Sequence, residues 1–128
     1  MSLAGFIAVG AGAALGAWMR WALSLLLNPV FPMLPLGTLA ANVIGGYLMG
    51  LAMGMIGHFE ALPAELRLLI TTGFLGGLTT FSTFSAETVT LMARAQYGWT
   101  AALIAVHVVG SVLATFAGIE TWRLIFRA

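Results

Sequence analysis

Residues 73–88 read Gly-Phe-Leu-Gly-Gly-Leu-Thr-Thr-Phe-Ser-Thr-Phe-Ser-Ala-Glu-Thr and decide the fold, because they place glycines and hydroxyls inside an otherwise apolar segment. In hydrocarbon an unpaired backbone group is so unfavourable that a helix breaks only where the freed carbonyls and amides face protein, water or an ion. The stretch therefore predicts a membrane helix that is broken within the bilayer, and an ion or solute pathway around residues 73–84.

The composition of the whole chain supports a membrane protein. Of its 128 residues 61% are hydrophobic and 7% are charged, and the mean hydropathy is +1.05. A spanning helix takes roughly 20 apolar residues, so we expect a single all-α domain, residues 1–128, surrounded by the lipid bilayer. The net charge of +1 without a polybasic patch argues against nucleic acid as a partner.

Turn signals divide the chain into four predicted transmembrane helices. Asn28-Pro29 and Phe31-Pro32 end the first, and we expect this helix to remain uncleaved because Arg20 follows its apolar run instead of preceding it. Trp99 and Trp122 near the ends of the last span are typical of membrane interfaces. The expected spans are residues 3–27, 36–56, 66–95 with a break at 73–80, and 99–126.

Small residues recur at four-residue spacing in three of the spans, a pattern that lets helix backbones approach closely in lipid. Three such ridges give more contact surface than four helices use on one another, so they predict a homo-oligomer, with ordinary intramolecular packing as the alternative. The ridges are Ala8, Gly12 and Gly16; Gly46, Gly50 and Gly54; and Gly110, Ala114 and Gly118.

The arginines are almost evenly divided between the two ends of the predicted helices. Three of them, Arg67, Arg123 and Arg127, fall on the side of the N-terminus, and Arg20 and Arg94 lie nearer the opposite side. Because Lys/Arg asymmetry sets the orientation of a membrane protein, this balance predicts insertion both ways. Two copies would then pair antiparallel.

Two polar stripes run along the second and fourth predicted helices. Asn42 shares a four-residue repeat with Thr38 and Gly46, and its amide is either a donor to an anion or a bond between helices. His107, Ser111 and Thr115 form the second stripe, whose alternative is hydroxyls that bond back to their own helix.

Charged and aromatic residues near the break complete the candidates. Arg20 has two alternatives. Its side chain faces a polar partner or a water-filled vestibule within the membrane, or it extends to the membrane–water interface. Glu87 lies one turn after Thr83, so the two side chains are expected along one wet track. Phe81 and Phe84 pack in the ordinary way or present their positive ring edges to a small anion.

Three segments resemble the small microbial fluoride channels, the Fluc or CrcB family. They are Gly-Ala-Trp-Met-Arg-Trp (16–21), Gly-Thr-Leu-Ala-Ala-Asn-Val-Ile-Gly-Gly-Tyr (37–47) and Thr-Gly-Phe-Leu-Gly-Gly-Leu-Thr-Thr-Phe-Ser-Thr-Phe-Ser-Ala-Glu-Thr (72–88). The resemblance covers essentially the whole chain. It implies passive fluoride export across the cell inner membrane by an antiparallel, dual-topology homodimer with two pores and a central structural sodium ion.

The resemblance also implies roles for individual residues. Asn42 becomes a pore-lining donor, Phe81 and Phe84 line the fluoride path, and the backbone carbonyls of Gly76 and Thr79 hold the sodium ion. Arg20 and His107 are vestibule or structural residues, and some family members carry Tyr where this chain has His107. The remaining pore residues of the polar track are Ser82, Thr83, Glu87 and Ser111.

Other classes of function fit the sequence less well. A small proton-coupled multidrug antiporter has four short helices, but it needs a carboxylate in the first one, and residues 3–27 contain no Asp or Glu. A non-transporting assembly subunit would explain the ridges but not the polar break. An enzyme is disfavoured because the chain has no Asp, no Ser/His/Asp set and no His pair at metal-binding spacing.

Overall fold

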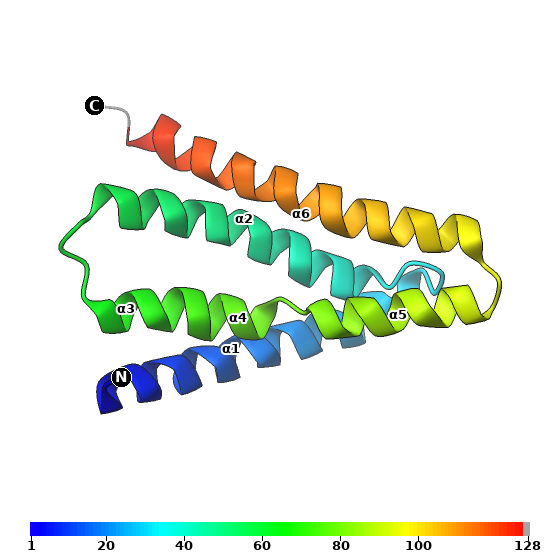
Figure 1. Cartoon of the computed structure of the whole chain (residues 1–128), viewed down its shortest axis with the longest axis horizontal. Helices are drawn as coiled ribbons and strands as arrows, with labels where there is room; N and C mark the ends of the chain where they lie inside the picture. The colour runs from blue at the N-terminus through cyan, green and yellow to red at the C-terminus, as the bar shows by residue number, and fades with distance from the viewer. Residues whose placement is uncertain (127–128) are drawn as a thin grey trace.

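The protein is all-helical in a computed structural model that describes residues 1–126. Four helices are long and apolar enough to cross a membrane, as the sequence predicted, so the chain is a multi-pass membrane protein. Figure 1 shows them as long rods, with the start of α1 and the end of α6 at the same end of the bundle. The elements are α1 (Leu3–Leu27), η1 (Asn28–Val30), α2 (Leu36–His58), α3 (Ala64–Leu68), η2 (Leu69–Leu75), α4 (Gly76–Leu78), α5 (Phe81–Ala93) and α6 (Tyr97–Ile125).

The short connection between α1 and α2 is closed by one side chain. The α2 helix begins after Pro35, which offers no capping side chain. Asn28 Oδ1 instead accepts from the backbone N–H groups of Gly37 at 2.7 Å and Thr38 at 3.1 Å. These are two of the donors that a helix start leaves unpaired. The Asn-Pro sequence therefore both ends α1 and starts α2.

Glycines set the packing of the helices. A Cβ on Gly118 of α6 would lie 2.9 Å from the Cα of Gly50 on α2, and these two helices lie side by side along most of their length (Figure 1). On α1, a Cβ on Gly12 would lie 2.7 Å from the Phe74 nitrogen, and one on Gly16 would lie 2.6 Å from the Leu78 nitrogen. The ridges thus serve contacts within the chain, which removes the reason they gave for an oligomer.

The helical boundaries differ slightly from the sequence expectations. The α2 helix continues to His58 instead of Ile56, and α6 begins at Tyr97, before Trp99. The third rod, which consists of α3, η2, α4 and α5, begins at Ala64, directly after Pro63, whose backbone is not helical (φ −57°, ψ 141°). Its middle part, η2, is a π-helical turn that continues into α4.

The buried core is small. Ala41, Leu75, Leu78 and Leu103 are the most fully buried apolar side chains, whereas many large apolar residues on the outer faces are exposed. This distribution suits a chain surrounded by lipid, in which the outer faces need no burial by protein.

Candidate functional site

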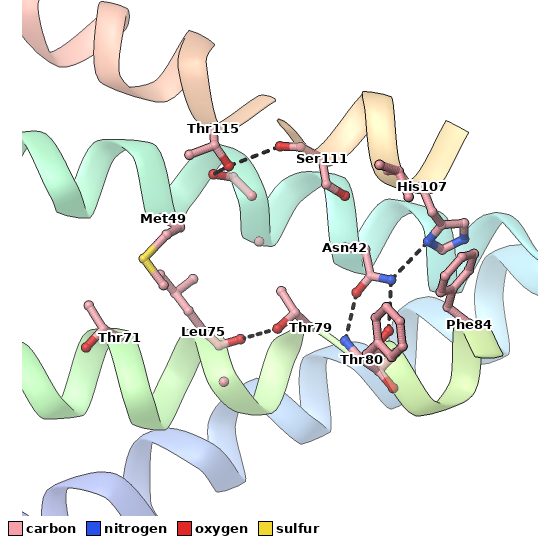
Figure 2. Close-up of a pocket in the computed structure, with 15 residues that line it drawn as sticks. Asn42, Met49, Thr71, Leu75, Thr79, Thr80, Phe84, His107, Ser111 and Thr115 are labelled. Atoms are coloured by element: carbon pink, nitrogen blue, oxygen red, sulfur yellow. Dashed lines mark hydrogen bonds between the residues drawn. The ribbon is translucent and has the colours of Figure 1, made fainter. Parts of the chain in front are cut away.

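The third rod is interrupted between α4 and α5. Thr79 (φ −83°, ψ 156°) and Thr80 (φ −148°, ψ 119°) are both extended, and α5 restarts at Phe81 with the Thr80 hydroxyl accepting from the Thr83 N–H at 3.1 Å. Figure 2 shows this segment facing Asn42 on α2 and the middle of α6. Two extended residues leave several backbone groups without helical partners, and the surrounding residues must replace them.

Asn42 supplies part of the replacement. Its Oδ1 accepts from the Thr80 N–H at 2.7 Å, and its Nδ2 donates to the Thr80 carbonyl at 3.0 Å (Figure 2). The second hydrogen on Nδ2 faces His107 Nδ1, also at 3.0 Å. In the structure the Asn42 amide therefore connects α2 to the interrupted backbone and to α6.

The same bonds free two backbone carbonyls. In a continuous α-helix the Thr80 N–H would bond to the Gly76 carbonyl, but it donates to Asn42. The Thr83 N–H would bond to the Thr79 carbonyl, but it donates to the Thr80 hydroxyl. Gly76 and Thr79 are therefore two of the residues whose carbonyl oxygens lose their regular donors. Carbonyl oxygens are hard donors of the kind that bind small cations.

A third carbonyl at the interruption is taken by Arg20. The Arg20 Nε donates to the Gly77 carbonyl at 3.0 Å across the interface of α1 and α4. A guanidinium close to the end of α4 also complements the negative end of that helix segment. Of the expectations for Arg20, the structure favours a structural partner over an extended, unattached side chain.

The glycines before the interruption do not provide its extended backbone. Among the described residues no glycine has a positive φ, and Gly73, Gly76 and Gly77 all lie within helical segments. A Cβ on Gly77 would lie 2.9 Å from the Ala13 Cα, and one on Gly73 would lie 2.9 Å from the Val9 carbonyl oxygen. Gly73 and Gly77 are therefore explained by close approach to α1, and the extended backbone is carried by Thr79 and Thr80.

An open hollow of about 420 Å³ lies beside the interruption. It gathers residues from α2, the third rod and α6, as Figure 2 shows. The Ser111 hydroxyl faces this space without a hydrogen bond to another described residue. The sequence-predicted residues that line the hollow are Asn42, Gly76, Thr79, Phe81, Phe84, His107 and Ser111.

Three aromatic rings follow one another along one side of the hollow. Phe81 and Phe84 meet edge to face with centroids 5.6 Å apart, and Phe84 stacks on His107 with centroids 4.5 Å apart. Phe84 is 8% exposed, whereas Phe81 is 78% exposed. The inner ring is thus fixed by packing, and the outer ring is available to lipid or to a further chain.

The remaining polar-track residues lie on α5 outside the hollow. Glu87 Oε2 accepts from the Thr38 hydroxyl at 2.6 Å, while Oε1 is buried without a partner among the described residues. Thr83 and Glu87 line a second groove of about 200 Å³ that also contains Arg94. Ser82 is exposed and lines neither space.

Two contributors were not assigned a role from the sequence. Thr80 is the residue whose backbone Asn42 holds, and Thr38 is the partner of Glu87. Thr38 stands one helical turn before Asn42, so the polar stripe on α2 was a usable signal for it. Nothing in the run of hydroxyls distinguishes Thr80 from its neighbours, because its contribution is made by the backbone.

Comparison with known proteins places these features in a family. Residues 7–119 match the family model described as CrcB-like protein, Camphor Resistance (CrcB). The chain is 60% identical over 121 residues to a fluoride-specific ion channel FluC from Nitrosospira multiformis, covering 94% of each chain. It is 58% identical over 125 residues to the protein of that name from Aromatoleum aromaticum, covering 95% of each.

Proposed function

The chain belongs to the CrcB-like family, and from this we propose that it is a passive fluoride-selective channel that exports fluoride across the cell inner membrane. The observation that carries the proposal is the near-complete match to relatives named fluoride-specific ion channels. The geometry is compatible with it, because the polar residues shared by three helices gather at one interruption inside an apolar bundle.

The proposed path runs along the hollow and onto α5. An anion in low dielectric needs hydrogen-bond donors or positive dipoles throughout its passage. Ser111 offers a free hydroxyl, and Phe81 and Phe84 offer ring edges. The hydroxyls of Ser82, which is exposed, and of Thr83, which is half-buried, would continue the path, and Glu87 would border it.

We propose that two copies pair in opposite orientations to give a dual-topology homodimer with two pores. The balanced arginines support both orientations. The open hollow and the exposed Phe81 ring support a second chain that completes the wall. Each protomer would contribute one set of pore residues, so the antiparallel pair has two equivalent paths.

A structural sodium ion fits the interruption. The carbonyls of Gly76 and Thr79 have lost their helical donors, and Gly76 is exposed on the surface of the bundle. Two antiparallel copies would bring four such oxygens together, a donor set that suits a small hard cation. Bound there, sodium would supply positive charge that offsets the burial of these carbonyls.

The direct test is fluoride efflux from liposomes that contain the purified protein, with chloride efflux from matched liposomes as the control. Protein-free liposomes give the background for both ions. We expect rapid fluoride efflux and no chloride efflux above background. Fluoride efflux at the protein-free rate, from protein shown to be folded and inserted, would contradict the proposed function.

A further inference from the structure

Arg20 is a charge within a membrane span that has no counter-charge. It lies on α1 and is half-buried, and the one ion pair among residues 1–126 joins two other side chains. A charged residue inside a span is costly and normally has a polar partner. The Arg20 side chain has its partner on α4, because its Nε donates to the Gly77 carbonyl oxygen at 3.0 Å.

Gly77 is held closely against α1. The α1 and α4 helices are in direct contact, and a Cβ on Gly77 would lie 2.9 Å from the Cα of Ala13. The Arg20 bond is made at the C-terminal end of α4, where Leu78 is the last helical residue. Carbonyls at a helix end lack donors from their own helix. Arg20 therefore fixes the Gly77 peptide group at a point where the helix itself no longer does.

The neighbouring carbonyls are the ones proposed to bind sodium. Gly76 directly precedes Gly77 but is exposed and lines the hollow, and a Cβ on it would meet nothing closer than 3.7 Å. Thr79 lines the same hollow, and the backbone of the next residue, Thr80, is held by Asn42 from α2. Each proposed ligand is thus followed in the chain by a residue whose backbone another helix holds.

We propose that Arg20 is a positioning residue of the cation site: by holding the Gly77 carbonyl against α1, it fixes the direction of the Gly76 carbonyl and keeps a further carbonyl away from the ion. The proposal rests on the proposed sodium site and names a group that prepares it. A site binds more tightly when its ligands are already in place, because binding then orders less of the protein. The donor at Nε is what the site requires, since the positive charge of the guanidinium itself repels a cation.

Two substitutions isolate the donor from the charge. In Arg20→Gln the side-chain NH₂ group stands at the position of Nε, because the same number of bonds separates each nitrogen from Cα, so a donor to Gly77 remains and the charge is lost. In Arg20→Met an unbranched side chain of the same length keeps neither the donor nor the charge. Arg67→Met is the matched control, because it removes an exposed charge from α3, at the start of the third rod.

Sodium binding is measured by titration calorimetry on the full chain in lipid nanodiscs, purified in a large organic cation without sodium. A carbonyl left without its donor corresponds to about a 5- to 150-fold change in an equilibrium constant. We expect Arg20→Met to bind sodium more weakly than Arg20→Gln by about that factor, and Arg67→Met to bind it as the wild type does.

Equal sodium affinity in Arg20→Gln and Arg20→Met, with binding retained in the wild type, would overturn the role of Arg20 and leave the cation site intact. A wild-type protein that binds no sodium would contradict the cation site and the role of Arg20 together. Protection of the Thr80 amide from hydrogen exchange shows that each variant keeps the interrupted backbone, because the Asn42 bonds are unchanged by these substitutions.

A measurement on the unsubstituted protein covers the case in which Arg20→Met misfolds. Glycine carbonyls are labelled with ¹³C and arginine with ¹⁵N, and solid-state NMR in lipid bilayers follows both labels with and without sodium. We expect the Gly77 carbonyl to stay within reach of Arg20 Nε in both states, while the Gly76 carbonyl resonance shifts when sodium is added. A Gly77 carbonyl that leaves Arg20 and shifts with sodium would refute the assignment, because Gly77 would then itself be a ligand.

Discussion

Removing the Asn42 amide should release the interruption between α4 and α5. In Asn42→Ala, three hydrogen bonds are lost: two to the backbone of Thr80 and one to His107. Hydrogen bonds between membrane helices average about 0.6 kcal/mol and reach about 1.7 kcal/mol. Three of them therefore correspond to about 2 to 5 kcal/mol. If the loss appears as local opening, the Thr80 amide should exchange about 30-fold to several thousand-fold faster.

The assay is hydrogen exchange of the Thr80 amide, followed by NMR in lipid nanodiscs. Tyr47→Phe is the matched control, because the Tyr47 hydroxyl donates to Thr121 at 3.0 Å between the same two helices, α2 and α6, without touching Thr80. The control should leave the exchange of the Thr80 amide unchanged. A Thr80 amide that remains equally protected in Asn42→Ala would show that Asn42 does not hold the interrupted backbone.

Four further outcomes are expected. Gly118→Ala should destabilise the bundle by about 1 to 3 kcal/mol or more in a steric-trapping measurement, because its Cβ would lie 2.9 Å from a backbone atom of α2. The control Gly57→Ala should leave the stability unchanged, because nothing lies within 4 Å of its Cβ. Phe81→Ile and Phe84→Ile should each slow fluoride efflux while the fold is kept; unchanged efflux from both would remove the rings from the path. C-terminal tags should be reached by an impermeant reagent from both sides of the membrane, and a single orientation would exclude the antiparallel pair. Protein prepared entirely without sodium should lose dimer stability or fluoride efflux, and identical behaviour with and without sodium would contradict the cation site.

The overall arrangement was predictable from the sequence because lipid permits few alternatives. A span must satisfy its own backbone, so long apolar segments become helices, and prolines together with Asn28 mark their ends. The purpose of the glycines was harder to infer, since both conformational freedom and small size favour the same residue. At Gly73 and Gly77 small size is the reason, because α1 passes where a Cβ would stand.

The candidate site was predictable as a set of residues but not as a set of bonds. The contacts that define it join positions far apart in the chain, such as Asn42 with Thr80 and His107. They also use backbone groups, which leave no signature in the sequence. A polar stripe on a helix therefore shows that a side chain needs a partner, whereas the identity of the partner follows only from how the helices pack.

The hydrogen bonds at the interruption leave its backbone carbonyls in two different states. The carbonyls of Thr80 and Gly77 receive new donors from Asn42 and Arg20, whereas those of Gly76 and Thr79 receive none from the described residues. Oxygens that remain unpaired favour a cation. Asn42 Nδ2 also lies 3.0 Å from His107 Nδ1, so the same side chain connects the break to α6. The single amide of Asn42 thus holds the extended backbone of Thr80 in place, and the carbonyls of Gly76 and Thr79 are left without their helical donors.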